Sequence, residues 1–326
     1  MAFRPPGYEM KSKKKHRKKS RSVQRIEYLA ILAGIGLIRM LPTGIINTLC
    51  SFLGRTVYSL LSGRREIALR NLRNAFGTTK SEQEIRTIAR ESCRSFLLTG
   101  AELIKFDLQS LGRDAIETRG YRPDHLQQLF LKAKGIHEDS GGCIFVTPHI
   151  GNWELLPFVC SIVGIPLALV ARPLDNVHLE KLIYENRSFP GQVIIPKKNA
   201  MFVLQQILRQ GKSIGMLPDQ STQRGIPIEF FGNPATTTPV PALLSIHYKR
   251  PIVVVACCRR ADEQRFEGYV CDPIWPRDSA EERDEIIRIT EEMTRNMEAI
   301  IRRHPEQYLW MHNRWKTYRK KKHVLA

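Results

Sequence analysis

The sequence predicts an α/β protein, in which a mostly parallel sheet is flanked by helices and preceded by a hydrophobic helical part. Two observations carry this prediction. From residue 142 onward, short apolar stretches alternate with helical stretches of about ten residues, the pattern of β-α-β units. The amino-terminal third is basic and apolar and lacks that alternation. We expect three parts, over residues 1–25, 26–62 and 63–326.

Residues 1–25 form a basic tail. They contain ten lysines and arginines against one glutamate, nearly half of the formal net charge of +19. Because like charges repel and nothing in the stretch can be buried, we expect it to be unfolded. Such a tail suits anionic lipid and nucleic acid equally well, and the character of the next segment decides between them.

Residues 26–62 are hydrophobic. The uncharged core at 28–38 is too short for a membrane span of about 20 residues, and Arg39 and Pro42 interrupt the apolar stretch beyond it. We expect two helices that lie in the membrane interface, with a single tilted span or ordinary core helices as the alternatives. A polybasic segment beside an apolar anchor favours the anionic cytoplasmic leaflet.

Two more helices are expected before the α/β pattern begins. In "RREIALRNLRNAF", residues 64–76, apolar and arginine side chains are interleaved as on an amphipathic helix with a basic face, which can contact phospholipid headgroups or simply face solvent. Ser81 and Glu84 then form a capping box ahead of a long helix.

The alternating part predicts strands and helices in a definite order. Strands are expected at residues 143–147, 166–171, 192–196, 213–218 and 251–259, and helices at residues 152–163, 178–187 and 200–210. Short apolar strands separated by helices are typical of a parallel sheet. The strand order cannot be read from this pattern.

The cysteines indicate a reduced protein. There are seven, no two form a CxxC pair, and several lie in apolar runs. This pattern is typical of buried thiols in a protein that faces the cytosol, and not of a disulfide framework or a zinc site. We expect no metal and no cofactor.

The stretch "FVTPHIGNWELLPF", residues 145–158, places His149 at the end of a buried strand and Glu154 five residues later. The spacing alone has no weight, because one such pair is expected by chance. The context has more: Pro148 and Gly151 keep the histidine out of the helix, and Asn152 is a natural N-cap. Glu154 would then lie in the first helical turn and reach back to the imidazole.

This arrangement predicts general-base chemistry. A carboxylate on one ring nitrogen of His149 raises the basicity of the other, and the helix N-terminus offers donors for developing negative charge. These are the parts needed to remove a proton from a hydroxyl while it attacks a carbonyl. The alternative is a structural histidine that caps a turn.

Two other classes of protein fit less well. An esterase or thioesterase would normally have a G-x-S-x-G elbow, which is absent; Cys143 is a conceivable nucleophile, but its place at the start of a buried strand favours an inert thiol. A nucleic-acid-binding protein could use the basic tail. It would leave the His149 loop unexplained, and the sequence has no aromatic–basic interleaving and no zinc or RNP signature.

Several blocks resemble one family. "VTPHIGNWELLP" resembles the His-x4-acid block of the glycerolipid-type acyltransferases, in the form typical of the bacterial late lipid A acyltransferases (lauroyl/myristoyl type). "LVARPLDN", "GMLPDQSTQRGIPIEFFGNPATTTPVPALLS" and "KRPIVVVAC" resemble the second, third and fourth blocks in order. "GRREIALRNLRNAF" and "PEQYLWMHNRWKT" are also in the family's style, so the resemblance spans about residues 28–318.

The resemblance implies an acyltransferase domain over 63–326, at the inner (cytoplasmic) membrane, with its active site facing the cytoplasm or inner leaflet. The enzyme would move a fatty acyl chain from acyl carrier protein or acyl-CoA to a hydroxyl of a phosphorylated glycolipid, a lipid A precursor. His149 would deprotonate the hydroxyl, and Glu154 would orient and charge the imidazole, without a metal or an acyl-enzyme. A basic surface suits an acidic carrier protein and anionic lipid. No nucleic-acid partner is expected.

The resemblance also implies substrate-binding residues. Arg172 would help to hold the phosphorylated acceptor, and Gln220 lies with Asp219 at the turn of the third block. In many relatives that block has glutamate and glycine, so Asp219 is open between binding the acceptor, assisting Arg172 and shaping a turn. Arg314 would meet phosphate or anchor the carboxy terminus, and Asn152 would bind substrate or shape the loop. Another membrane glycolipid, such as a phosphatidylinositol mannoside, is the alternative acceptor, and the depth of an apolar tunnel would set the acyl chain length.

Overall fold

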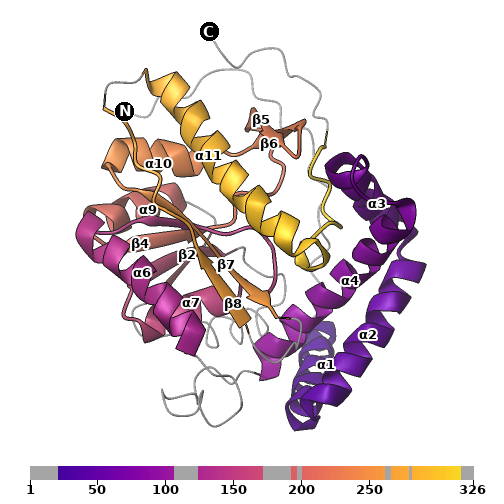
Figure 1. The fold of residues 1–326 in the computed structure, drawn as a ribbon. Coiled ribbons are helices and arrows are strands. Elements are labelled where there is room, and N and C mark those ends of the chain that lie inside the picture. The colour runs from indigo at the N-terminus through magenta and orange to yellow at the C-terminus, as the bar shows by residue number, and fades with distance from the viewer. Residues whose placement is uncertain are drawn as a thin grey trace, which may run out of the picture.

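A mostly parallel sheet forms the centre of the computed structural model, which describes residues 21–105, 124–171, 192–196, 200–260, 266–278 and 281–316 (Figure 1). Within these residues the strand order is β3-β2-β4-β1-β7-β8, and only β8 runs antiparallel to its neighbour. The strands are β1 (Ile144–Val146), β2 (Leu167–Ala171), β3 (Gln192–Pro196), β4 (Ser213–Met216), β7 (Ile252–Arg259) and β8 (Phe266–Val270). A separate antiparallel hairpin pairs β5 (Ile226–Phe230) with β6 (Asn233–Thr237).

Helices cover both faces of this sheet. One face shares its core with α9 (Ala200–Arg209), α10 (Val240–Tyr248) and α11 (Glu282–Arg303). The other face packs against α6 (Asp124–Ser140) and α7 (Leu155–Ile162). Side chains alternate between the two cores along each strand, so that Ile144 and Val146 point to the first and Phe145 to the second.

The α/β class and the five predicted strands are confirmed, with strand ends shifted by no more than two residues. The helices predicted at 152–163 and 200–210 are also present, although the first begins three residues later than predicted. The helix predicted at 178–187 lies outside the described residues. The sequence did not predict α6, the β5–β6 hairpin, α10 or β8.

Four helices precede the sheet, namely α1 (Arg21–Met40), α2 (Thr43–Leu60), α3 (Ser62–Phe76) and α4 (Glu82–Lys105). The capping box before α4 is confirmed: the Ser81 N–H donates to Glu84 Oε2 at 2.8 Å, and the Glu84 N–H donates to Ser81 Oγ at 3.3 Å. Helix α1 begins inside the stretch predicted to be unfolded, so residues 21–25 are helical, whereas residues 1–20 lie outside the described part.

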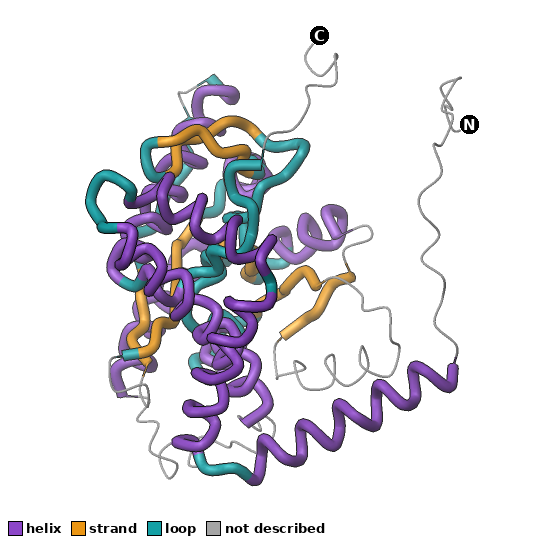
Figure 2. Tube along the Cα trace, turned by 90° about the vertical axis from the view of Figure 1, so that its right-hand side faces the viewer, coloured by secondary structure: helices purple, strands orange, loops and turns teal. Residues whose placement is uncertain are grey.

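The two predicted hydrophobic helices, α1 and α2, expose much of their apolar surface. On α1 the most exposed large apolar side chains are Met40, Ile26, Leu29 and Leu37, and on α2 they are Leu60 and Phe52. Helix α2 buries its other side against α4, through Ile46 and Cys50. Figure 2 shows α1 extending away from the rest of the chain. Among the described helices, none combines the length and the apolar character that crossing a bilayer requires.

A buried ion pair fixes α4 to the end of β7. Arg259 Nη2 lies 2.6 Å from Glu102 Oε2, and the two side chains are only 4% and 12% exposed. The same guanidinium donates to the hydroxyls of Ser95 and Thr99 at 2.9 and 2.8 Å. Such a pair adds little net stability when it is complete, but the loss of one partner leaves a buried charge without compensation.

We therefore predict that Arg259→Ala lowers the free energy of unfolding by about 3–5 kcal/mol, as measured by urea denaturation. Arg73→Ala is the matched control, because Arg73 also lies 2.6 Å from a glutamate, Glu82, but on the surface. Exposed pairs contribute little, so the control should change the unfolding midpoint much less. Equal effects would show that burial does not set the strength of the Arg259 contact.

Candidate active site

The candidate site lies where two neighbouring strands of the sheet end. Strands β1 and β4 pair in parallel, with Phe145 beside Gly215. The helix that follows β1 is α7, on one face of the sheet, and the helix that follows β4 is α10, on the other. The chain therefore diverges at this pair of strands, and ligand sites of open α/β sheets lie at the carboxyl ends of such strands. His149 follows β1 and Asp219 follows β4, so the topology brings them together.

Asp219 binds the histidine with both carboxylate oxygens. His149 Nδ1 lies 2.7 Å from Asp219 Oδ1, and the His149 backbone N–H donates to Oδ2 at 2.8 Å. Because a carboxylate accepts hydrogen bonds, Nδ1 carries the ring proton and Nε2 keeps its lone pair. The Gln220 side-chain nitrogen lies 3.3 Å from Nε2, the distance of an amide that donates to that lone pair.

The surrounding charges make the imidazole more basic. Burial on its own would lower the pKa of His149, but the charge and hydrogen bond of Asp219, with a smaller contribution from the charge of Glu154, raise that pKa above its ordinary value. For Asp219 the effect of burial has the opposite sign, because on its own it would raise the pKa of the carboxyl group. The contacts with His149 and the charge of Arg314 hold it below its ordinary value instead, so Asp219 is a carboxylate.

The sequence predicted a hydrogen bond between Glu154 and the His149 ring, but Asp219 makes this bond instead. Glu154 lies in a turn one residue before α7 and lines the cavity beside the imidazole. It therefore acts on the imidazole through its charge, and Asp219 supplies the direct hydrogen bond.

The loop that carries His149 is tied to the core. Gly151 has φ +58°, and a Cβ there would lie 2.1 Å from the Cys257 carbonyl oxygen, so only glycine fits. The Asn152 N–H donates to the same carbonyl at 2.8 Å. The prediction that Asn152 caps the next helix is wrong, because its buried side chain donates to Glu102 at 2.7 Å instead. Asn152 therefore connects the His149 loop to Glu102 on α4.

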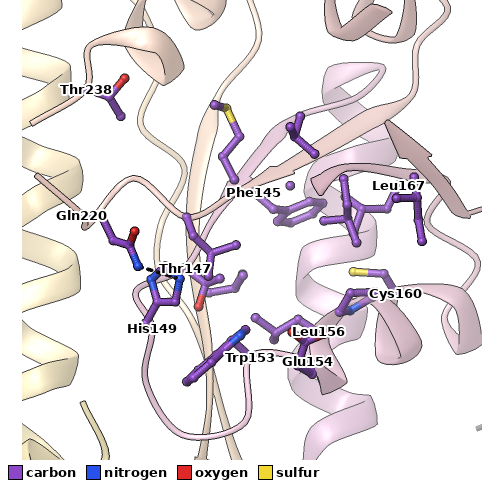
Figure 3. A pocket seen from close by; sticks show the side chains of 18 residues that line it. Phe145, Thr147, His149, Trp153, Glu154, Leu156, Cys160, Leu167, Gln220 and Thr238 are labelled. Carbon is purple, nitrogen blue, oxygen red and sulfur yellow. Dashed lines mark hydrogen bonds between the residues drawn. The ribbon is translucent and has the colours of Figure 1, made fainter. Parts of the chain in front are cut away.

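A cavity of about 630 Å³ opens beside the imidazole (Figure 3). This volume lies within the range of small-molecule sites. His149, Gln220, Trp153 and Glu154 line it together with Thr147 and Thr238. The rest of its described wall is mainly apolar, and is formed by Phe145, Leu156, Pro157, Cys160, Leu167, Leu169, Val170, Ile194, Gly215, Met216, Leu217 and Val255.

Of the other predicted substrate residues, Arg172 lies outside the described part of the chain, and Arg314 is not among the residues that line the cavity. Arg314 is 2% exposed and donates to the Thr236 carbonyl at 2.8 Å and the Thr237 hydroxyl at 2.5 Å. These contacts match the anchoring role that the sequence left open, and the guanidinium also stabilises the Asp219 carboxylate.

Cys143 has the properties of an inert thiol. It is buried, and burial raises its pKa to about 12, so it is protonated at neutral pH. This confirms the interpretation favoured from the sequence.

The sequence did not reveal the role of Asp219 or the presence of Tyr308 in the site. The Tyr308 side chain is buried against Asp219, which contributes with burial to raising the tyrosine pKa. The sequence contained one usable signal for Asp219: like His149, it follows an apolar strand within three residues. Tyr308 follows no strand and had no comparable signal.

Comparison with known proteins gives a consistent result. A family described as bacterial lipid A biosynthesis acyltransferase matches residues 13–317. The chain is 24% identical over 307 residues to a lipid A biosynthesis palmitoleoyltransferase of Escherichia coli (strain K12), covering 91% of this chain and 94% of the relative. A lipid A biosynthesis acyltransferase of Shigella flexneri gives the same figures. One from Haemophilus influenzae is 26% identical over 227 residues, covering 66% of this chain and 70% of the relative.

The family match extends over the amino-terminal helices, the sheet and the loops that carry His149 and Asp219. The chain belongs to the bacterial lipid A biosynthesis acyltransferase family.

Proposed function

We propose that this acyltransferase moves a fatty acyl chain from a thioester donor to a hydroxyl of a phosphorylated glycolipid of the lipid A type, with His149 as the general base. One observation supports this most: the Nε2 side of the imidazole lines an apolar cavity while Nδ1 is held by a carboxylate. A hydroxyl and an acyl carbonyl can therefore meet at the one ring nitrogen that carries a lone pair, once the Gln220 amide has moved away from it.

The proposed reaction uses one proton-transfer group. Nε2 of His149 takes the proton of the acceptor hydroxyl as its oxygen attacks the thioester carbonyl carbon. The tetrahedral intermediate then expels the thiolate, which takes the proton from the imidazolium, and the products are an ester and a free thiol. Before the acceptor hydroxyl can reach Nε2, the Gln220 amide must move away from that nitrogen. The amide would then lie beside the reacting oxygens.

Asp219 and Glu154 have different proposed roles. Asp219 is a positioning residue, because its two oxygens fix the ring orientation and the tautomer and stabilise the imidazolium that forms. Glu154 contributes negative charge from the cavity wall, which favours the imidazolium without fixing the ring. The electrostatic role proposed for Glu154 from the sequence is therefore retained, whereas the hydrogen bond to the imidazole is assigned to Asp219.

The substrates follow from family membership and charge. The names of the relatives support a lipid A-type acceptor, and Arg172 remains the proposed contact for its phosphate. The donor is proposed to be a thioester of acyl carrier protein or coenzyme A. A chain with a formal charge of +19 attracts an acidic carrier and anionic lipid through the same long-range field.

Membrane association is proposed to occur through α1 and α2. Their exposed apolar side chains, next to the basic tail, favour insertion into the interface of an anionic bilayer. We propose that the protein lies at the inner membrane, with the His149 cavity facing the cytoplasm or inner leaflet.

We predict that His149→Ala abolishes acyl transfer, and that Asp219→Asn lowers kcat by about 10²- to 10⁴-fold, the usual contribution of an oriented general base. Glu154→Gln should cost less than Asp219→Asn, because the Nδ1 contact remains. Transfer to a lipid A precursor is measured by mass spectrometry, with thermal unfolding and vesicle binding as controls for folding. A Glu154→Gln loss larger than that of Asp219→Asn would contradict these roles.

The pH profile provides a second prediction. A general base works in its neutral form, so kcat/KM should rise with pH through the pKa of His149, which lies above the ordinary histidine value. Asp219→Asn removes the charge that does most to raise this pKa and leaves the burial that lowers it, so the rising limb should move to lower pH. Glu154→Gln should move it in the same direction by less. A limb that stays in place in Asp219→Asn would refute the assignment.

For the membrane contact, we predict that Ile26→Ser with Leu29→Ser weakens binding to anionic vesicles about tenfold or more, since each buried aliphatic side chain contributes about 1.5–3 kcal/mol. The matched control is Leu131→Ser with Phe202→Ser, two exposed apolar residues on α6 and α9. Co-sedimentation should show normal binding for the control. Equal loss in both double variants would argue against a specific contact through α1, and retention on DNA alone would favour a nucleic-acid partner.

A further inference from the structure

The cavity beside His149 has a defined far end. Figure 3 shows His149 and Gln220 at one end, and Leu167 and Cys160 at the other. Leu167 is the first residue of β2, and Cys160 lies on α7, which packs over this face of the sheet. Both are almost fully buried, with exposed fractions of 4% and 3%.

A missing side chain keeps the middle of the cavity open. Gly215 on β4 pairs with Phe145 on one side and Leu169 on the other. A Cβ at this glycine would lie 2.4 Å from Leu169 Cδ2. Strand β4 therefore contributes no side chain between the sheet and α7 at this point, and the space left above it forms part of the cavity.

The far end accepts hydrocarbon and little else. Its described lining around Leu167 and Cys160 is apolar, with Phe145 and Leu169 on the sheet and Leu156 on the helix. Burial raises the pKa of the Cys160 thiol, so that group stays neutral. Of the charged and imidazole side chains that the structure places on the cavity wall, His149 lies at the other end, and Glu154 lies between the two ends, in the turn before α7 (Figure 3).

We propose that Leu167 and Cys160 form the wall that stops the acyl chain, and that they thereby select the length of the chain that is transferred. This rests on the proposed function, in which the thioester carbonyl is held at His149. With one end of the chain fixed there, each extra methylene must be accommodated at the far wall. Because both residues belong to a close-packed core, the wall cannot yield freely.

The test uses purified full-length variants and a series of saturated acyl thioesters that differ by two carbons, with products identified by mass spectrometry. Leu167→Ala should raise kcat/KM for the next longer donor relative to the preferred one by about tenfold or more, and Cys160→Met should favour the next shorter donor by a similar factor. These factors correspond to the discrimination of about 10- to 200-fold that a pocket shows per methylene. If Cys160→Met does not fold, Cys160→Val supplies a smaller addition at the same place.

Leu204→Ala is the matched control, because Leu204 is equally buried but belongs to the core on the other face of the sheet. It should leave the length preference unchanged. Active wall variants with the wild-type preference, or a control that shifts it as much, would overturn the proposal. A wild-type enzyme that transfers no acyl chain would instead refute the proposed function, so the two failures are distinguishable.

Discussion

The hydrogen bond between His149 Nδ1 and Asp219 joins two loops that are far apart in the sequence and adjacent in the sheet. It depends on β1 and β4 being parallel neighbours, because only then do both loops leave the sheet at the same edge. The carboxy-terminal segment supports the same point: the Leu309 N–H donates to the His149 carbonyl at 3.0 Å, and Tyr308 packs against Asp219. The orientation of one imidazole is thus set by three segments of the chain.

A second network connects this loop to the amino-terminal helices. Glu102 on α4 binds both Arg259 and Asn152, and the Thr99 hydroxyl donates to the Gly151 carbonyl at 2.7 Å. Helix α4 packs in turn on α2, one of the two helices with exposed apolar surface. The buried polar groups around Glu102 therefore hold the His149 loop in register with the proposed membrane-binding part.

The strands and His149 could be predicted because they depend on local pattern: apolar runs, Pro148, and a glycine that ends the turn. The partner of His149 could not be predicted in this way. Without the strand order, a sequence shows only which residues are close along the chain, and Glu154 was the nearest acidic residue after His149. Asp219 reaches the ring through the order of the strands, which no local pattern encodes. The β5–β6 hairpin was missed for another reason: Pro227 and Pro234 lie within its strands, where proline normally argues against a strand.

The most direct test of the central interaction is ¹⁵N NMR of the histidine ring in the full-length protein near neutral pH. We expect His149 to carry its proton on Nδ1 and to lose this preference in Asp219→Asn but not in Glu154→Gln. A proton on Nε2 in the wild-type protein, or a change of tautomer only in Glu154→Gln, would contradict the assignment of Asp219 as the group that orients the base.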